Sequence, residues 1–398
     1  MDKLQVIIKK KASILLDETI RLRRHFHMYP ELSFREKKTA DFICSYLDDK
    51  NIEYINNLAD TGIIAWINGS KGDGIVVALR AELDALPLIE KTGLEYSSRN
   101  EGVMHACGHD AHLAILLSSA SIIKDINNEF GGTIVFIFQP GEEMAPGGAR
   151  LLMETKAFKD IKPDLLIAQH VLPGLKSGMT GFKPGIYMAS SDEIHIKVKG
   201  RGGHAALPDE SSDQVRIGSE LVVKLKKKID DYPTDKPLVL GIGRFIADGA
   251  TNVIPPEVFI QGTIRTFDEI VRSDIKKIVE EECKNTAERY KVSIDLKIPD
   301  GYPVLENSVE YVMRAFDLAG EINGKKMVTK LDRRMSSEDF AYFSQKYPVV
   351  FYRLGISSES EGKNGLHTSN FTLDEKAMMT GVRTLSYLGL KLTENKDS

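Results

Sequence analysis

The sequence predicts an α/β protein whose mostly parallel sheet is interrupted by an inserted α+β domain. The first observation is a set of short, continuously apolar runs that alternate with helical patterns, as in parallel sheets buried on both faces. The second is a change, after Gly185, to alternation of apolar and polar residues, which is typical of a sheet with one wet face. The third is the return of the first pattern from about Asp300.

The first part of the chain is expected to open with a helix at residues 4–24 and a second helix after Pro30-Glu31-Leu32-Ser33. In the second helix Cys44 shares an apolar stripe with Ile43 and Leu47, so we interpret it as a small core residue. The elements expected next are the strands Gly62–Ile67, Gly74–Leu79, Thr133–Phe138 and Leu165–Ala168, and the helices Ala111–Ile126 and Gly148–Lys156.

The alternating region reads as a ferredoxin-like β-α-β-β-α-β unit. Ile194, Ile196 and Val198 alternate with polar residues, and the same pattern recurs in two later strands. Cys283 lies on the apolar stripe of the second helix, so we expect it to be structural. The predicted order is strand 193–199, helix 212–229, strand 237–246, strand 257–266, helix 273–289 and strand 291–298.

The last part of the chain returns to the α/β pattern, with helices at Val309–Ala319 and Ser337–Gln345, a strand at Val349–Leu354 and a final helix from Asp374. The simplest account is one α/β domain in two segments, residues 1–185 and 299–398, around an inserted domain at residues 186–298. At 398 residues, two or three domains are expected.

Composition narrows the class of protein. A net charge of -4 gives no reason to expect nucleic acid or an anionic membrane as partner. The chain has three cysteines, which is a small and odd number, so a disulfide framework is not expected and a reducing compartment is favoured. The N-terminus has no signal-peptide pattern, and apolar runs such as Ile134–Phe138 are too short to span a bilayer. We expect a cytoplasmic protein.

The stretch Met104–His112 concentrates metal-binding side chains just before an apolar helix. Cys107 and His109 are two positions apart, and a carboxylate and another imidazole follow, which are ligand types at a ligand spacing. The alternative is a polar turn with an incidental buried cysteine. The density of such residues favours a metal site.

Other candidate residues follow the predicted strands, at the edge where an α/β sheet carries its working groups. Glu142 and Glu143 are adjacent on one such turn, so one can bind a metal while the other moves a proton between water and a leaving amine. The alternative is a solvated acid pair at the start of a helix. The remaining candidates at strand ends are Glu82, Asp84, His170 and His367.

Several ordered motifs run along nearly the whole chain: His27-Met28-Tyr29-Pro30-Glu31-Leu32-Ser33, Arg80-Ala81-Glu82-Leu83-Asp84-Ala85-Leu86-Pro87, Met104–His112, Gln139-Pro140-Gly141-Glu142-Glu143, Gly202-Gly203-His204-Ala205-Ala206, Asn252-Val253-Ile254-Pro255, Ser337-Glu338-Asp339-Phe340 and Leu366-His367. In this order they are highly specific. The chain resembles the M20 family of metal-dependent amidohydrolases and peptidases, in its aminoacylase-like subfamily of hippurate, indole-acetyl-amino-acid and N-acetyl-diaminopimelate hydrolases.

The resemblance implies a metallo-exopeptidase-like catalytic domain, and an inserted domain that serves as a lid and a dimerisation domain. It also implies a pair of divalent metal ions, held by the residues that match the family's ligands. These are Cys107, His109, Glu143, His170 and His367.

Further roles follow from the same resemblance. Glu142 matches the general base, and Asp84 matches the carboxylate that orients a histidine ligand or helps to set the metal pair. His204 matches a histidine that reaches the active site, often that of the partner subunit, and polarises the scissile carbonyl. Asn252 matches a residue of the substrate-binding side.

The chain departs from the family's usual pattern at two positions. Glu82 stands where the family usually has Asp, and Asp209 stands where the subfamily often has His, with Glu210 adding a second acid. These departures leave the identity of the substrate open. His112, one helical turn after His109, is expected to support the ligands or cap the helix before it binds a metal itself.

The predicted function is cleavage of the amide bond of N-acyl amino acids or short peptides by a metal-activated water, with Glu142 as general base and then acid. The donor set fits zinc, with manganese, cobalt or nickel also possible. Two alternatives stay open: a dipeptidase or carboxypeptidase of the same family, and a non-catalytic protein that binds metal or amino acids. We expect a homodimer, or a higher homo-oligomer, through the inserted domain, because its sheet offers an exposed edge strand.

Overall fold

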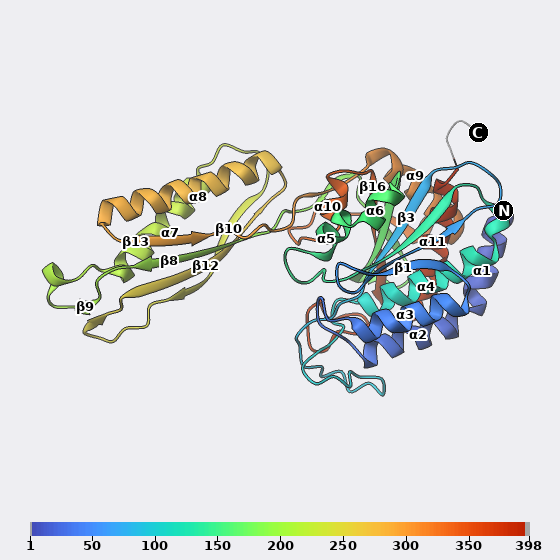
Figure 1. The fold of residues 1–398 in the computed structure, drawn as a ribbon, viewed down its shortest axis with the longest axis horizontal. Helices are drawn as coiled ribbons and strands as arrows, with labels where there is room; N and C mark the ends of the chain where they lie inside the picture. The colour runs from blue at the N-terminus through green and yellow to red at the C-terminus, as the bar shows by residue number, and fades with distance from the viewer. Residues whose placement is uncertain (1, 395–398) are drawn as a thin grey trace. The chain divides into compact units, whose positions relative to one another are not determined.

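The structure is a computed structural model that describes residues 2–394, and it divides into two compact units (Figure 1). The first unit contains residues 2–187, 306–332 and 339–394, and the second contains residues 188–305 and 333–338. Residues 299–305 and 333–338, which the sequence assigns to the last α/β segment, belong to the second unit. Their backbone bonds to it: Ala189 N donates to the carbonyl oxygen of Arg334 over 3.1 Å.

The first unit is built on an eight-stranded sheet in the order β1-β2-β4-β3-β5-β16-β6-β15. Its central strands β4, β3, β5 and β16 run parallel, whereas β1, β2 and β6 join by antiparallel pairing. The strands are β1 (Glu53–Leu58), β2 (Gly62–Asn68), β3 (Val76–Glu82), β4 (Thr133–Gln139), β5 (Leu165–Lys176), β6 (Thr180–Phe182), β15 (Val328–Lys330) and β16 (Val349–Ser357).

Helices surround this sheet, and two of them differ from the prediction. The helix expected at residues 4–24 is two helices that meet at Leu15, and the helix expected at Ser337–Gln345 is one short turn. The helices are α1 (Lys3–Ile14), α2 (Leu16–Met28), α3 (Lys37–Asp49), α4 (His109–Asp125), α5 (Gly148–Glu154), α6 (Lys156–Ile161), α9 (Val309–Asn323), α10 (Ala341–Ser344) and α11 (Ala377–Leu392), with 3-10 turns η1 (Asn127–Glu129) and η3 (Lys325–Met327).

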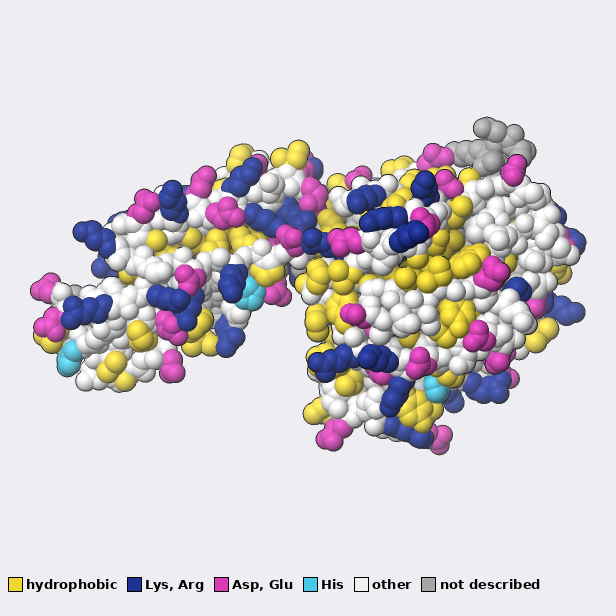
Figure 2. Space-filling model, viewed as in Figure 1, with side chains coloured by type: hydrophobic (Ala, Val, Ile, Leu, Met, Phe, Trp, Pro, Cys, Tyr) yellow, Lys and Arg dark blue, Asp and Glu magenta, His cyan; other side chains and the backbone are white. Residues whose placement is uncertain are grey.

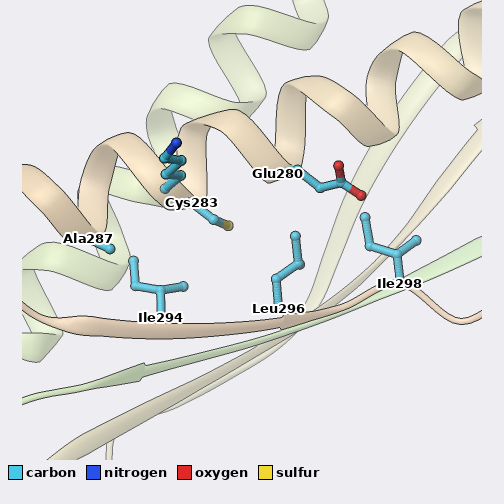
Figure 3. A pocket seen from close by; sticks show the side chains of 7 residues that line it. Glu280, Cys283, Ala287, Ile294, Leu296 and Ile298 are labelled. Atoms are coloured by element: carbon cyan, nitrogen blue, oxygen red, sulfur yellow. The ribbon is translucent and has the colours of Figure 1, made fainter.

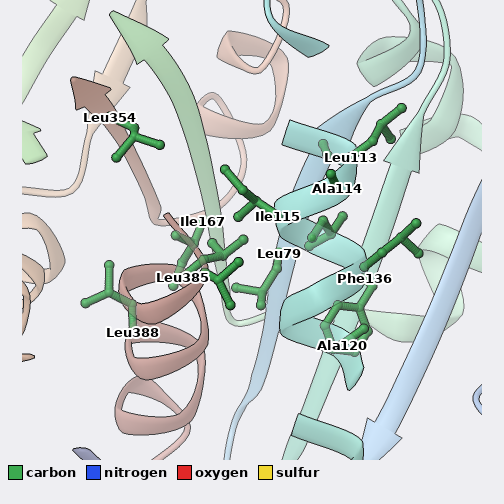
Figure 4. Close-up of a cluster of buried hydrophobic side chains, with 14 of the residues drawn as sticks. Leu79, Leu113, Ala114, Ile115, Ala120, Phe136, Ile167, Leu354, Leu385 and Leu388 are labelled. Atoms are coloured by element: carbon green, nitrogen blue, oxygen red, sulfur yellow. The ribbon is translucent and has the colours of Figure 1, made fainter. Parts of the chain in front are cut away.

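The core of the first unit lies between α4, α11 and the sheet, as Figure 4 shows. Leu79 of β3 and Ile167 of β5 meet Ile115 of α4 and Leu385 of α11. Residues His109–Ile123 of α4 are all buried, because this helix is apolar on nearly every side and is covered all round. The start of α4, where His109 lies, is therefore held by a rigid core.

The second unit confirms the predicted β-α-β-β-α-β order. Its sheet, β10-β12-β8-β13, is antiparallel throughout, and α7 and α8 pack against one face over a core that includes Cys283. Figure 3 shows the groove between α8 and the edge strand β13, with Cys283, Leu296 and Ile298 along it. The elements are β8 (Asp192–Lys199), β9 (Gly203–His204), η2 (Pro208–Glu210), α7 (Gln214–Asp230), β10 (Leu238–Ile246), β11 (Val253–Ile254), β12 (Glu257–Thr266), α8 (Glu269–Tyr290) and β13 (Ser293–Lys297).

Two short strands, β7 (Gly185–Met188) and β14 (Leu305–Asn307), pair where the chain passes between the units. Basic and acidic side chains are interspersed on the face of each unit that Figure 2 shows. Among residues 2–394, every helix is too short or too polar to cross a bilayer.

Candidate metal centre

Cys107 and His109 lie where the loop after β3 turns into α4. Gly108 between them has φ +86°, and a Cβ there would lie 2.5 Å from Val171 Cγ2, so this turn requires glycine. Both flanking side chains are buried. The turn holds a thiol and an imidazole beside each other at the start of a helix.

His109 presents one unpaired nitrogen to the site. Its Nδ1 donates to the carbonyl oxygen of Asp84 over 2.8 Å, which leaves Nε2 facing the site. Within the described residues, neither His109 Nε2 nor Asp84 Oδ1 has a hydrogen-bond partner, although both are buried. Burial works to lower the pKa of His109, but Glu82, Asp84 and Glu143 raise it to about 10. The surroundings of this nitrogen therefore favour positive charge.

Glu143 and His367 complete this side of the centre. Ligand atoms of Cys107, His109 and Glu143 all lie within 4.8 Å of one another. His367 Nε2 is 3.2 Å from Glu143 Oε1, and the backbone N of His367 donates to Ala106 O over 2.8 Å. His367 has φ +61°, and this uncommon backbone conformation turns the loop after β16 back toward the loop of Cys107.

His170 reaches the same place from β5. Its Nε2 is 3.4 Å from Cys107 Sγ, and its Nδ1 is 2.8 Å from Val171 O. The sequence predicts a strand that ends at Ala168, before His170. In the structure β5 continues to Lys176, so His170 lies within the strand and its backbone is held by pairing with β16.

His112 uses both ring nitrogens in contacts with protein groups beside the centre. Its Nδ1 is 2.8 Å from Glu82 Oε2, and its Nε2 accepts a hydrogen bond from Val171 N over 3.0 Å. Because Nε2 accepts, Nδ1 carries the proton and donates it to Glu82. Glu82, His109, His112 and His170 approach one another closely enough to surround an ion, but both nitrogens of His112 are already used by protein groups.

The Glu82 side chain, which is longer than the Asp that the family usually has here, also contacts Arg80. Burial works to raise the pKa of Glu82, but Arg80 and His112 hold it well below its usual range. Arg80 Nε donates to Gln139 Oε1 over 2.8 Å, and its Nη2 donates to Asp339 Oδ1 over 2.7 Å. These buried groups join the ends of β3 and β4 to the segment at residue 339.

Glu142 lies between Gly141 and Glu143 on the loop after β4 and is 6% exposed. Its neighbour Glu143 is held through its backbone N, which donates to Asp84 Oδ2 over 2.9 Å. Burial, followed by Glu143 and Glu142, raises the pKa of the Cys107 thiol well above its usual value. Negative charge thus collects around the thiol and His109.

His204 and Asn252 lie in the second unit and are neighbours there. Strand β9 pairs His204 with Val253 of β11, and Ala205 N donates to Asn252 O over 2.9 Å. Both side chains are exposed, and His204 Nδ1 accepts from Ala206 N over 3.1 Å.

The supporting groups Arg80, Gln139 and Asp339 have no assigned role in the sequence prediction. Each stands inside a motif that the sequence analysis singled out, and this is the signal that could have found them. Their spacing in the chain could not show that one arginine joins all three segments.

Comparisons with known proteins identify the chain. The model of Peptidase family M20/M25/M40 matches residues 78–391. The chain belongs to this family. An N-acyl-L-amino acid amidohydrolase of Geobacillus stearothermophilus is 38% identical over 75% of this chain and 80% of its own length. An N-acetyl-L-cysteine deacetylase of Bacillus subtilis (strain 168) is 35% identical over 92% of this chain and 86% of its own length.

Solved structures agree with the fold of this M20 chain. A Bacillus subtilis protein described as a dinuclear metal binding peptidase from the M20 family superposes with a TM-score of 0.81 at 30% identity. The match covers 96% of this chain and 99% of that one. The predicted family and the predicted α/β fold with an inserted domain are confirmed.

The donors of this M20 chain fit the two divalent metal ions that the family implies. The buried atom His109 Nε2, which has no hydrogen-bond partner in the part of the chain that the structure describes, is the kind of group that a buried site leaves open for a cation. One thiol, imidazoles and a carboxylate are borderline ligands that suit zinc and its first-row neighbours. The residues that converge are Cys107, His109, Glu143, His170 and His367.

Proposed function

We propose that this M20 hydrolase cleaves the amide bond of N-acyl amino acids, with Glu142 moving the proton. The observation that carries the proposal is the pairing of two adjacent carboxylates with different surroundings. Glu143 lies within reach of Cys107, His109 and His367, whereas Glu142 is not a member of that group. The relatives named for N-acyl amino acids support the substrate class.

Five residues would hold two metal ions: Cys107, His109, Glu143, His170 and His367. When bound, such ions supply Lewis acidity that makes water more acidic and polarises a carbonyl oxygen. Glu142 takes a proton from the attacking water, whose oxygen bonds to the carbonyl carbon of the amide. The same carboxyl group then gives that proton to the leaving nitrogen as the C–N bond breaks, so the products are a carboxylate and an amine.

Asp84 orients this machinery through its backbone carbonyl and one oxygen of its carboxylate. Its carbonyl accepts from His109, and its Oδ2 accepts from Glu143 N. We assign His204 to the stabilisation of the developing negative charge on the carbonyl oxygen, and Asn252 to substrate binding. Both side chains are exposed, and His204 on β9 lies beside the residue that follows Asn252, which supports this assignment.

The native state is proposed to be a homodimer formed through the second unit, in the cytoplasm, with zinc or manganese bound. Its four-stranded sheet ends in the edge strands β10 and β13, and proteins usually pair or protect such edges. All three cysteines are free, which fits a reducing compartment.

The test is hydrolysis of N-acetyl, hippuryl and dipeptide substrates by protein that has been stripped with a chelator and then reloaded with zinc or manganese. We expect release of amine from the N-acyl substrates only after reloading, with little release from dipeptides. Preferential release from dipeptides would replace the amidase with a peptidase. If the protein binds two metal ions per chain but hydrolyses none of these substrates, a non-catalytic binding protein would be favoured.

A further inference from the structure

The segment 31–36 overlaps the end of the motif at residues 27–33, to which the proposed function gives no role, and it contacts both loops of the candidate centre. Ser33 Oγ donates to Asp84 Oδ2 over 2.7 Å, on the loop after β3. Glu36 Oε1 accepts from Gly141 N over 2.9 Å, on the loop after β4. One short piece of chain therefore bonds to the two loops that carry the charged groups.

The Glu36 carboxylate is fully buried and joins three separate segments. Its Oε1 also accepts from Phe34 N over 2.9 Å, and its Oε2 accepts from Thr61 Oγ1 over 2.7 Å. A buried carboxylate is costly without such donors, so all three bonds favour one orientation of this side chain. A single oxygen atom holds the backbone of Phe34 and the backbone of Gly141 at a fixed separation.

The backbone conformations of Phe34 and Gly141, and the packing of the Phe34 ring on the glycine, fix the same two segments relative to each other. Phe34 has φ +62°, which is rare for an aromatic residue, and Gly141 has φ +57°. A Cβ on Gly141 would lie 2.3 Å from Phe34 Cζ, so the ring packs directly on the glycine. Strained backbone of this kind persists where the surroundings determine it, and it concentrates at functional sites.

The loop fixed in this way is the one that carries Glu142 and Glu143. Glu36 holds it immediately before Glu142, through Gly141 N. Ser33 holds it through Asp84, whose Oδ2 also accepts from Glu143 N over 2.9 Å. Neither Ser33 nor Glu36 is among the converging ligand atoms.

We propose that Ser33 and Glu36 are positioning residues of the hydrolytic reaction, which set the loop of Glu142 and Glu143 through Asp84 and Gly141. The inference rests on the proposed function, in which Glu142 moves the proton and Glu143 binds metal. Small displacements of a proton-transfer group slow the chemical step, whereas they change substrate binding less.

The test compares two changes at Glu36 in the full-length, metal-loaded protein. Glu36→Asp shortens the side chain, so that it cannot hold Gly141 and Thr61 together. We expect kcat to fall about a hundredfold while KM stays within about twofold. Glu36→Gln keeps the oxygen that accepts from Phe34 and Gly141, and its amide can donate to Thr61 Oγ1. We expect this variant to restore kcat to within about threefold of the parent.

Glu31→Asp is the matched control, because it makes the same chemical change five residues away. The Glu31 carboxylate accepts from Thr39 N over 2.9 Å and from Thr39 Oγ1 over 3.0 Å, at the start of α3. We expect a lower melting temperature with unchanged kcat and KM. Ser33→Ala gives a second readout that does not depend on turnover: zinc affinity, measured by competition with a chromophoric chelator, should fall about tenfold.

Glu142→Gln separates this inference from the proposed function. If Glu142→Gln keeps full activity, the proposed function fails, and the positioning role fails with it. If Glu142→Gln is inactive but Glu36→Asp behaves like Glu31→Asp, only the positioning role is overturned. If Glu36→Asp does not fold, unchanged zinc affinity in Ser33→Ala overturns the positioning role, and weakened affinity supports it.

Discussion

Two histidines in different units make the same pair of contacts in opposite surroundings. His112 lies between the Glu82 carboxylate and the Val171 N–H, and it is buried with both partners. His195, on the open face of the second unit's sheet, lies between the Glu193 carboxylate and the Gln261 side-chain amide. The His195 and Glu193 side chains are 35% and 69% exposed.

The same hydrogen-bond pattern can therefore contribute very different amounts to the free energy of unfolding, depending on burial. Water can replace either partner of His195, so the loss of one contact there costs little. No water can easily replace the partners of His112, so a lost contact leaves a buried polar group unpaired. We therefore expect large effects in the first unit and small effects on the second unit's open face.

The largest difference should appear in activity. Glu142→Gln removes the group that accepts and returns the proton, and we expect kcat to fall about 10³-fold. His195→Gln on the open sheet face should leave kcat within about twofold, because a lost exposed contact of this kind is worth little. Steady-state hydrolysis of an N-acetyl amino acid by the metal-loaded proteins checks both. Equal losses in the two variants would contradict the comparison.

The next effect concerns buried charge. Arg80→Met leaves Glu82 and Asp339 buried without their cation, so we expect the free energy of unfolding to fall by about 3–5 kcal/mol. The matched change Arg244→Met removes an exposed arginine that donates to Gln261 over 2.9 Å, and should cost less than about 0.5 kcal/mol. Urea unfolding of both variants measures the difference. A small loss in Arg80→Met would mean that water reaches this network.

A third effect depends on pH. Burial, followed by the charge of Asp84, raises the pKa of Glu36 to about 7. Between pH 4.5 and 7 the unfolded chain loses this proton before the folded protein does, so Glu36 makes folding less favourable as the pH rises through that window. Glu36→Gln should therefore gain on the order of 3 kcal/mol relative to the parent between pH 4.5 and pH 8. Unfolding curves at several pH values test this, and a constant difference would refute it.

The smallest expected effect is the difference in unfolding free energy between matched substitutions of the two histidines. His112→Leu leaves Val171 N unpaired in the core, and we expect a loss of about 1–3 kcal/mol. His195→Leu should change the free energy of unfolding by less than about 0.5 kcal/mol. Differential scanning calorimetry of the two variants is sufficient. Similar losses would show that contact pattern, and not burial, governs the cost.

Much of the fold could be predicted from the sequence, and the second unit most closely. Its strands have one solvent-exposed face, so apolar and polar residues alternate recognisably in the sequence. The six main elements of the structure fall within a few residues of the prediction. The break between α1 and α2 could not be seen in the same way. Leu15 is neither proline nor glycine, and the helices separate because α1 packs on α11 whereas α2 packs on α4.

The candidate site likewise has residues that could be predicted from the sequence and others that could not. Cys107, His109, Glu142, Glu143 and His367 could be proposed from the sequence because they stand in recognisable motifs, whereas His170 stands outside them. The extent of β5 could not be predicted, because His170, Pro173 and Gly174 disguise a strand that pairing with β16 enforces. The roles of Ser33, Glu36 and Arg80 depend on which loops meet in space, and no local pattern carries that information.

The pairing of β7 with β14 has a consequence for how the protein folds. Between the hydrogen-bonded strands β7 and β14 the chain forms one closed loop that makes up most of the second unit, and residues 333–338 join that unit separately. The entropy of closing a loop grows only with the logarithm of its length, so each doubling costs only about 0.6 kcal/mol. The segments before residue 188 and after residue 305 can therefore assemble around their common core at little cost from the long insertion. A short linker between β7 and β14 should close the same sheet.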